Sequence, residues 1–177
     1  MISYQYSKRI LKKAIIKIKD ENINSTNSLN RVVSKNVYSG INYPSGDNAA
    51  FDGYAINSND TKNIQKKLPK KFKIIGLIAA GNKPLKKKVN KYDAVEIMTG
   101  GIIPKGFNTI IPIEQIIFNP NKKNKKYILI DRRITKHKHV RFAGSDFKKK
   151  EVVVKKNTVI QPNHILAFKT LGIKNIT

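Results

Sequence analysis

The chain has 177 residues, of which 40% are apolar, and this is enough sequence for one domain or two small ones around a hydrophobic core. It contains no cysteine, which excludes disulfides, thiolate metal sites and cysteine nucleophiles. Its formal net charge of +25 attracts polyanions, yet the sequence holds no zinc-finger, RRM or KH signature.

The lysines that produce this charge are spread along the whole chain in short runs, mostly in segments typical of loops or strand ends. Arginines are few, whereas specific nucleic-acid readers favour arginine forks and aromatic side chains on one face. The lysine excess, with abundant Asn and Ile, therefore favours a compositional bias of the source genome over a nucleic-acid-binding function. No apolar run approaches the length of about 18 residues that a spanning helix needs, and no secretory signal follows the basic start. We expect a cytoplasmic protein with no membrane and no specific nucleic-acid partner.

The first predicted element is an amphipathic helix over Tyr4–Ile18, in which Lys and Arg lie opposite an apolar stripe. The stripe residues recur at spacings of three and four: Leu11, Ala14, Ile15 and Ile18. We expect this stripe to pack on the domain. A basic amphipathic helix can instead lie on an anionic membrane, but this apolar face lacks Trp and Phe, so packing is favoured.

After a polar stretch at 22–27, the segment Leu29–Val37 predicts a short helical turn and then a strand, and from there the chain is β-rich. The next predicted strands are Phe72–Ile78, Ala94–Met98, Thr109–Phe118 and Tyr127–Asp131. The last two flank a hairpin tip at 119–126, whose lysines we expect to be solvated surface. Near the end, the predicted elements are strands at Val152–Val154 and Val159–Ile160 and a helix over Pro162–Gly172 with Gly172 at its C′ position.

Three polar, glycine-containing loops interrupt the strand-forming sequence. In chain order, the first, second and third loops are Asn42–Ile56, Val95–Gly106 and Val140–Phe147. The first loop carries two carboxylates, Asp47 and Asp52, in a segment too polar to be core, and the second breaks at Thr99 beside two glycines. Loops of this kind, separated by strands, are typical of a cleft built from several turns of one β-rich domain.

In order and content, these loops resemble motifs of the molybdopterin molybdenumtransferases, the family that includes bacterial MoeA and the gephyrin E domain. The first loop matches at Pro44, Asp47, Asn48, Ala50, Asp52, Gly53, Tyr54 and Ala55. The second motif matches at Ile97, Met98, Thr99, Gly100, Pro104, Gly106 and Glu114, and the third at Arg141, Gly144 and Asp146. Departures are Ala49, Phe51, Gly101 in place of Ala, and Ser145 in place of Glu, so no role of that glutamate carries over. Three motifs in the right order are far more specific than one glycine-rich match.

Weaker similarity at Ser28–Val37 and Asn157–Ile173 extends the resemblance over nearly the whole chain. The implied fold is α+β and β-rich, with an elongated mixed domain at 1–43 and 148–177 that includes the N-terminal helix, and an inserted β-barrel-like domain at 44–147. Family members continue into an α/β domain that binds the pterin and then into a small β domain. The resemblance therefore implies that this chain lacks the pterin-binding α/β domain and is weak or inert alone.

The reaction that the resemblance implies inserts molybdate into adenylylated molybdopterin and yields molybdenum cofactor and AMP, with Mg²⁺ as the cofactor. The implied catalytic residues are Asp52, Thr99 and Asp146. We expect Asp52 and Asp146 to orient Mg²⁺ or water near the adenylate phosphate, and the Thr99 hydroxyl to hydrogen-bond the substrate. The implied substrate-binding residues are Arg141, Asp47, Asn48 and Gly100. The implied partners are a second copy of the chain in a homodimer and either a molybdopterin adenylyltransferase or a separate pterin-binding chain.

Several of these residues also have an ordinary structural interpretation. Asp52 precedes Gly53 and can cap a turn, and Thr99 can be a simple turn residue. Arg141 either contacts a substrate phosphate as a bidentate donor or pairs with Asp146.

Asp47 and Asn48 are expected to shape the first loop through Asx-type bonds to the backbone more than to touch substrate. His137 and His139 would project on one side of a strand and suggest a metal pair, but nothing supplies further ligands, which favours exposed histidines. Two rival functions stay open: a scaffold or dimerisation module that has lost the chemistry, and a nucleic-acid-binding protein driven by its charge.

Overall fold

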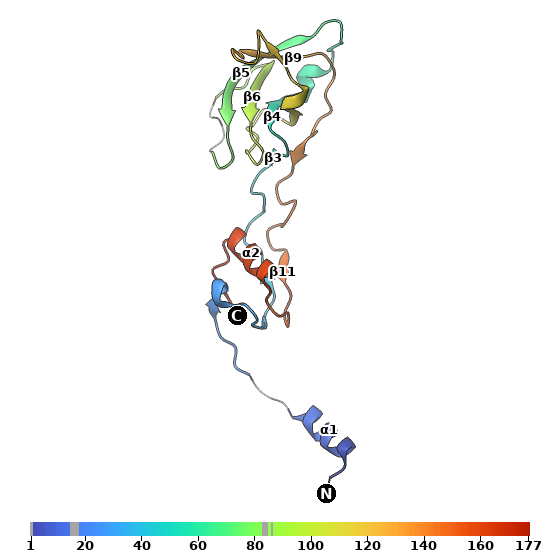
Figure 1. Ribbon diagram of the computed structural model, residues 1–177, viewed down its shortest axis with the longest axis vertical. Helices are drawn as coiled ribbons and strands as arrows, with labels where there is room; N and C mark the ends of the chain where they lie inside the picture. The colour runs from blue at the N-terminus through green and yellow to red at the C-terminus, as the bar shows by residue number, and fades with distance from the viewer. Residues whose placement is uncertain (1, 15–17, 83–84, 86) are drawn as a thin grey trace. The chain divides into compact units, whose positions relative to one another are not determined.

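The computed structural model describes residues 2–14, 18–82, 85 and 87–177, and several of its helices and strands are labelled in Figure 1. The chain divides into two compact units: unit 1, Met1–Tyr38 with Val152–Thr177, and unit 2, Ser39–Glu151. The domain bounds implied by the family resemblance, at 43/44 and 147/148, stay a prediction. No helix in the described ranges has the length and apolar character needed to cross a membrane.

Unit 1 is held together by pairing between strands from the two ends of the chain. Its short elements are β1 (Ile23–Asn24), η1 (Ser25–Asn27), β2 (Val37–Tyr38), β11 (Val152–Val154), α2 (Pro162–Thr170) and β12 (Asn175–Ile176). Strand β1 pairs antiparallel with β12, and β2 pairs antiparallel with β11. The buried core of this unit consists of Val33, Val37, Val154, Ile160, Phe168 and Ile176. Because these side chains come from both ends, neither end can form the core alone.

Helix α2 confirms the helix predicted near the end of the chain. Pro162 occupies its first turn, where the missing N–H costs nothing. The Gln161 N–H donates to Nδ1 of His164 at 3.0 Å and so satisfies a free backbone group at the helix start. Gly172 has φ +68° and stands just beyond the C-cap, a left-handed position that glycine adopts without strain.

Helix α1 spans Tyr4–Lys13, which is shorter than predicted, since Ala14 is already extended. Ile15 of the predicted stripe lies outside the described residues. No residue of α1 is buried, and Leu11 is 74% exposed. The prediction that this stripe packs on the domain is therefore wrong. Periodicity shows which face of a helix is apolar, but it carries no information about what covers that face.

Unit 2 contains a mostly antiparallel sheet in the order β7-β4-β6-β5-β9-β8. Its strands are β4 (Gly53–Ile56), β5 (Lys70–Ile78), β6 (Asp93–Ile97), β7 (Thr109–Pro112), β8 (Ile117–Asn119) and β9 (Tyr127–Ile130). Only β5 and β6 run parallel. Unit 2 also contains the separate pair β3 (Asn48–Ala49) and β10 (Val140–Arg141) and the short helix η2 (Ser58–Thr61). The predicted strands within β5, β6 and β9 are confirmed.

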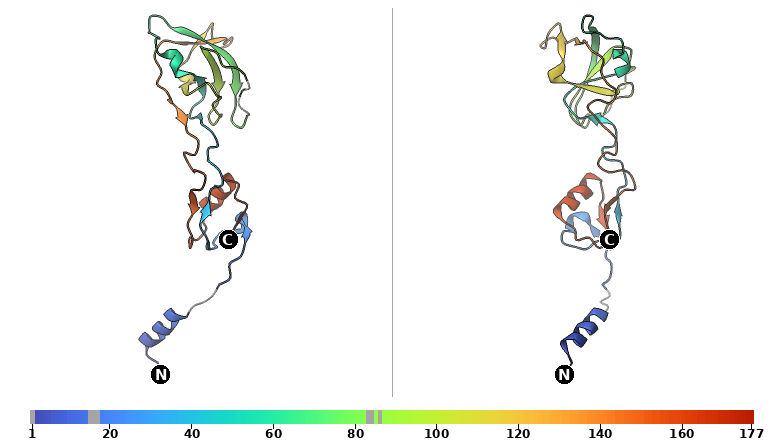
Figure 2. Two further views of the ribbon diagram at one scale, coloured as in Figure 1. Left: turned by 180° about the vertical axis from the view of Figure 1, so that it is seen from behind. Right: turned by 90° about the vertical axis from the view of Figure 1, so that its right-hand side faces the viewer.

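The sheet is curled, because its two edge strands are close neighbours in the sequence. Strands β7 and β8 are separated only by the 3-10 helix η3 (Ile113–Gln115) and one further residue. Six flat strands would place the edges about 24 Å apart, whereas the five steps from Pro112 to Ile117 span at most about 18 Å. Figure 2 shows the resulting half-barrel from two sides. The prediction of one continuous strand over Thr109–Phe118 is wrong, because η3 breaks it.

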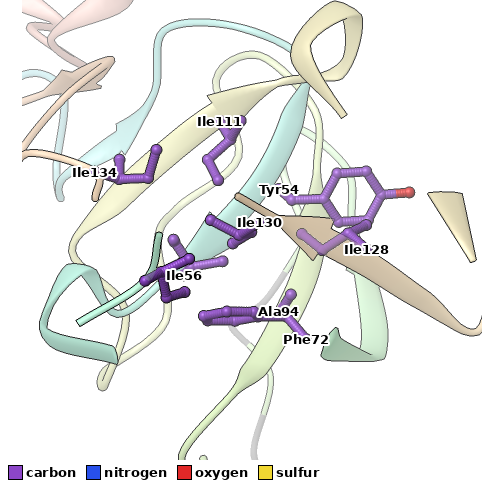
Figure 3. Packing of buried hydrophobic residues seen from close by; sticks show 9 residues of the cluster. Tyr54, Ile56, Phe72, Ala94, Ile111, Ile128, Ile130 and Ile134 are labelled. Carbon is purple, nitrogen blue, oxygen red and sulfur yellow. The ribbon is translucent and has the colours of Figure 1, made fainter. Parts of the chain in front are cut away.

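Strand β4 is buried along its whole length and supplies side chains to both hydrophobic clusters of unit 2. Tyr54 and Ile56 belong to the cluster in Figure 3, and Ala55 belongs to the other, as the alternation of a strand requires. The labelled members of the first cluster are Tyr54, Ile56, Phe72, Ala94, Ile111, Ile128, Ile130 and Ile134. The predicted α+β, β-rich character is confirmed by this architecture.

The predicted hairpin between β8 and β9 is also confirmed. Its tip was predicted to be solvated surface, and this is wrong for one of its lysines. Lys125 donates from Nζ to Oε1 of Glu96 in β6 at 2.6 Å. This ion pair attaches the tip to the sheet, so one lysine of the predicted solvated run has a structural partner.

Candidate functional site

Asp52 and Thr99 meet because the sheet brings their two loops together. Asp52 immediately precedes β4, and Thr99 lies just after β6. The two strands are antiparallel neighbours, with Gly53 opposite Ile97. Oδ1 of Asp52 accepts hydrogen bonds from the Thr99 backbone N–H and from the Thr99 hydroxyl, both at 2.7 Å. The interpretation of Asp52 as a local turn cap is wrong, because its carboxylate binds a residue 47 positions away.

These bonds define the charge and the free atoms of the pair. The backbone N–H of Thr99, and then its hydroxyl, lower the pKa of Asp52 below its ordinary value, at which a carboxyl group is already ionised at neutral pH. Oδ2 of Asp52 accepts no hydrogen bond from the described residues. The Thr99 hydroxyl has one proton, and it donates that proton to Asp52. It can therefore offer a substrate only its acceptor lone pairs while this bond lasts.

Replacing Thr99 with valine is expected to raise the pKa of Asp52 towards its ordinary value, because the hydroxyl donor is lost while the backbone donor stays. Replacing it with serine keeps the hydroxyl and should leave the pKa unchanged. A carboxyl carbon NMR titration of the two variants measures this directly. An unshifted Asp52 resonance in the valine variant would show that the hydroxyl bond has no influence on the carboxylate.

The glycines of the second loop allow the first loop to bind its main chain. The Gly100 N–H donates to the Ala49 carbonyl at 2.9 Å, and the Ala49 N–H donates to the Gly101 carbonyl at 3.0 Å. Gly100 has φ +80°, a left-handed backbone. A Cβ at Gly101 would lie 2.9 Å from both Ile97 Cγ1 and the Met98 carbonyl oxygen. Gly101, which replaces the alanine of the family pattern, therefore fits the tight local packing.

The third loop contains an ion pair between Arg141 and Asp146, in which NH2 of the guanidinium donates to Oδ2 of the carboxylate. The Ser145 hydroxyl donates to the other oxygen, Oδ1, at 3.4 Å. The structure therefore shows Arg141 in its second interpretation, as the partner of Asp146. Only one nitrogen of the guanidinium makes this pair, and the remaining donors of its planar fork are available to an anion.

The first loop holds the third loop mainly through backbone groups. The Tyr43 carbonyl accepts from the Asp146 N–H at 3.0 Å, and the Pro44 carbonyl accepts from the Gly144 N–H at 2.9 Å. Oδ1 of Asp47 accepts from the Ala143 N–H at 2.9 Å. Asp47 thus shapes the site, as expected, but through a partner 96 residues away and not within its own turn.

Asn48 and Asn42 extend this contact between loops. Asn48 lies opposite Arg141 in the β3–β10 pair, is 7% exposed, and its Oδ1 is buried without a partner among the described residues. An unpaired buried acceptor of this kind is costly and is often satisfied by a ligand or water. Oδ1 of Asn42 accepts from the Lys149 N–H at 2.8 Å. Sequence reasoning missed Asn42, because nothing local marks a residue whose partner is 107 positions away.

Replacing Asp47 with alanine is expected to loosen the third loop, because the Ala143 N–H loses its only charged acceptor. Hydrogen exchange at the Ala143 amide should become about tenfold faster, as the loss of a charge-assisted hydrogen bond implies. Replacing Asp47 with asparagine keeps an acceptor oxygen and serves as the control. Identical exchange in the alanine variant and the original chain would rule out this bond.

His137 and His139 do not form the metal pair that a strand would have produced. Their φ values are +64° and +56°, so they belong to a turn before β10 and not to a strand. Each ring makes an edge contact with a different aromatic residue, His137 with Phe142 and His139 with Phe51. Burial and then the charge of Lys138 lower the pKa of His139. Across residues 2–14, 18–82, 85 and 87–177, no group of three or more His, Asp or Glu side chains is placed to hold a metal ion.

The comparisons with known proteins agree with this fold. A family model described as the MoeA N-terminal region, domains I and II, matches residues 2–172. The structure is similar to the molybdopterin biosynthesis moeA protein from Pyrococcus horikoshii OT3, with a TM-score of 0.84, 31% identity, and coverage of 99% of this chain and 45% of that one.

Curated relatives include the molybdopterin molybdenumtransferases of Haemophilus influenzae, 31% identical over 156 residues, and of Bacillus subtilis, 28% identical over 150 residues. The matches cover 88% and 84% of this chain but only 36% and 34% of those relatives. The chain thus spans about a third of the length of these curated relatives.

Over 99% of its length, the chain has the fold of a molybdopterin biosynthesis moeA protein. More particularly, the chain belongs to the MoeA N-terminal region family.

Proposed function

We propose that this chain is the amino-terminal region of a cytoplasmic, homodimeric molybdopterin molybdenumtransferase. The complete enzyme takes adenylylated molybdopterin and molybdate and yields molybdenum cofactor and AMP. The observation that carries the proposal is the Asp52–Thr99 pair, an ionised carboxylate held by a neighbouring loop in an exposed position. A carboxylate whose pKa is lowered by specific hydrogen bonds to one oxygen, while its other oxygen stays unbonded among the described residues, is suited to binding a cation.

The donor chemistry at Asp52 fits the Mg²⁺ ion that the family implies. Both hydrogen bonds go to Oδ1, so Oδ2 stays available to the ion, which prefers one or two carboxylates with retained waters and phosphate oxygens. When bound, the ion would supply neutralisation of the adenylate phosphate charge. Asp146 is a second proposed ligand, for the ion or for a water molecule, although Arg141 and Ser145 engage both of its oxygens in this state.

The other residues of the loops position the substrate. Arg141 binds a phosphate oxygen with the donors that Asp146 leaves free, and Asp146 orients the guanidinium for that contact. Asn48 offers its unpaired Oδ1 to a donor on the substrate, and the Thr99 hydroxyl accepts a second hydrogen bond. Asp47 and Gly100 keep the three loops in register.

The 177 residues alone are not expected to carry out this reaction. The pterin-binding domain of the relatives has no counterpart among them, so we expect the isolated chain to be weak or inert. The missing domain would come from a continuation of the chain or from a separate pterin-binding chain, and a molybdopterin adenylyltransferase would deliver the substrate. Molybdate-dependent AMP release by the isolated chain would contradict this part of the proposal.

The decisive experiment uses a completed chain, in which residues 1–177 are followed by the carboxyl-terminal region of the Haemophilus influenzae relative. With adenylylated molybdopterin, molybdate and Mg²⁺, this completed chain is expected to release AMP. The unmodified relative serves as the positive control, and circular dichroism verifies that the completed chain is folded. A folded completed chain that releases no AMP, beside an active relative, would refute the proposed function.

A further inference from the structure

Unit 2 contains a cavity of about 490 Å³ beside the third loop that the roles above do not use. Two lysines, Lys105 and Lys136, and the imidazole of His137 line it, and Asp47 is its one acidic side chain. The Asp47 carboxylate already accepts the Ala143 N–H through Oδ1. Two lysines against one carboxylate give the side chains that line the cavity a net positive charge.

Two residues that line the cavity have a left-handed backbone conformation. His137 has φ +64°, which is strained for a residue with a Cβ. It is kept there by its N–H, which donates to the Asn108 carbonyl at 2.9 Å, and by its ring contact with Phe142. On the facing segment, Gly106 has φ +102°, and a Cβ there would lie 3.1 Å from Val89. Both conformations are fixed by their surroundings, so the walls of the cavity are preorganised.

The cavity is connected to the Arg141–Asp146 loop by two of its lining residues. Asp47 binds the third loop at Ala143, and Val140 is the neighbour of Arg141 in β10. A ligand in the cavity would therefore touch residues that position the third loop.

We propose that this cavity binds a tetrahedral dianion, either a phosphoryl group or molybdate itself. Lysines serve such anions as point charges, and the imidazole adds a directional donor. The dianion would sit between Lys105 and Lys136, with His137 closing the cavity on the side of Phe142. Which of the two anions binds in the cell rests on the proposed function, whereas the anion chemistry depends only on these residues.

The test is a titration of the 177-residue chain, followed by amide NMR at constant ionic strength, with inorganic phosphate and molybdate in separate arms. Saturable shifts are expected at Gly106, His137 and Val140. The double variant Lys105→Gln/Lys136→Gln should bind about tenfold more weakly, the size expected for two exposed charge contacts. The matched control Lys122→Gln/Lys123→Gln removes the same charge at the hairpin tip and should bind as the original chain does.

The two arms and the control decide the proposal. Saturation by phosphate, by molybdate or by both, lost in the cavity variant alone, supports it, and the tighter anion identifies the source. The absence of saturable binding overturns the proposal. Equal weakening in both double variants also overturns it, because the binding would then come from the net charge of +25 and not from the cavity. AMP release by the completed chain is a separate readout, so failure of the proposed function and failure of the anion cavity are distinguishable.

Discussion

Replacing Asp52 with alanine in the completed chain is expected to lower the rate of AMP release about a hundredfold, the usual cost of losing a group that stabilises charge at a reaction centre. The physical reason is the loss of a carboxylate that the Thr99 donors hold through Oδ1 and whose Oδ2 accepts no hydrogen bond from the described residues. AMP release is measured at saturating substrate over a range of Mg²⁺ concentrations.

The asparagine variant separates charge from position. Asp52→Asn keeps an acceptor for the Thr99 donors but carries no charge, so it should resemble the alanine variant and need more Mg²⁺ for half-maximal rate. Asp131→Asn is the control, because Asp131 pairs with its neighbour Arg132 at the surface of unit 2. If Asp52→Asn matched the original rate and Mg²⁺ dependence, Asp52 would be a structural link between loops and no more.

Replacing Gly53 with alanine is expected to destabilise unit 2 by about 3 kcal/mol or more, at the upper end of overpacking effects. A Cβ at this position would lie 2.0 Å from the Ile111 carbonyl oxygen, 2.9 Å from its carbon and 3.0 Å from Pro112 Cα. All three atoms are backbone of β7, which pairs with β4 along its whole length, so they cannot move without breaking the sheet. Urea unfolding of the 177-residue chain, followed by circular dichroism, gives the free energy.

Gly40 offers a matched control for this measurement. A Cβ at Gly40 would meet no atom within 4 Å. Both substitutions reduce the flexibility of the unfolded chain equally, so the difference between them isolates the collision in the folded state. Gly40→Ala should change the free energy of unfolding by about 0.5 kcal/mol at most. Equal stability of the two variants would mean that β4 and β7 do not approach as closely as described.

The strands and the loops of unit 2 could be predicted from sequence, because both leave local signals. Apolar runs bounded by polar and glycine residues predicted most of β5, β6 and β9, and the glycines beside Asp52 and Thr99 predicted the turns between strands. The bonds that turn these loops into one site left no such signal. Their partners are 47, 96 and 107 residues apart, and pairing at such distances depends on the sheet order.

The wrong predictions share a different cause, which is that a local pattern is compatible with more than one structure. The apolar run from Thr109 predicted one strand, but η3 divides it between opposite sheet edges. The spacing of His137 and His139 suited a strand, but both residues adopt a left-handed turn. In each case, tertiary contacts outweighed the local preference.

The way unit 1 is assembled sets an order of events during synthesis. Strands β2 and β11 pair with each other although the whole of unit 2 separates them in the sequence. The first and last residues of unit 2 also meet, because the Ser39 N–H donates to the Glu151 carbonyl at 2.9 Å. As the ribosome proceeds from the amino terminus, the sheet of unit 2 is complete before α2 and β12 exist. Unit 2 can therefore fold first and bring Tyr38 and Val152 together, which reduces the entropy that unit 1 must lose to close over so long an insertion. The three linked loops of unit 2 are thus formed before the two halves of unit 1 have met.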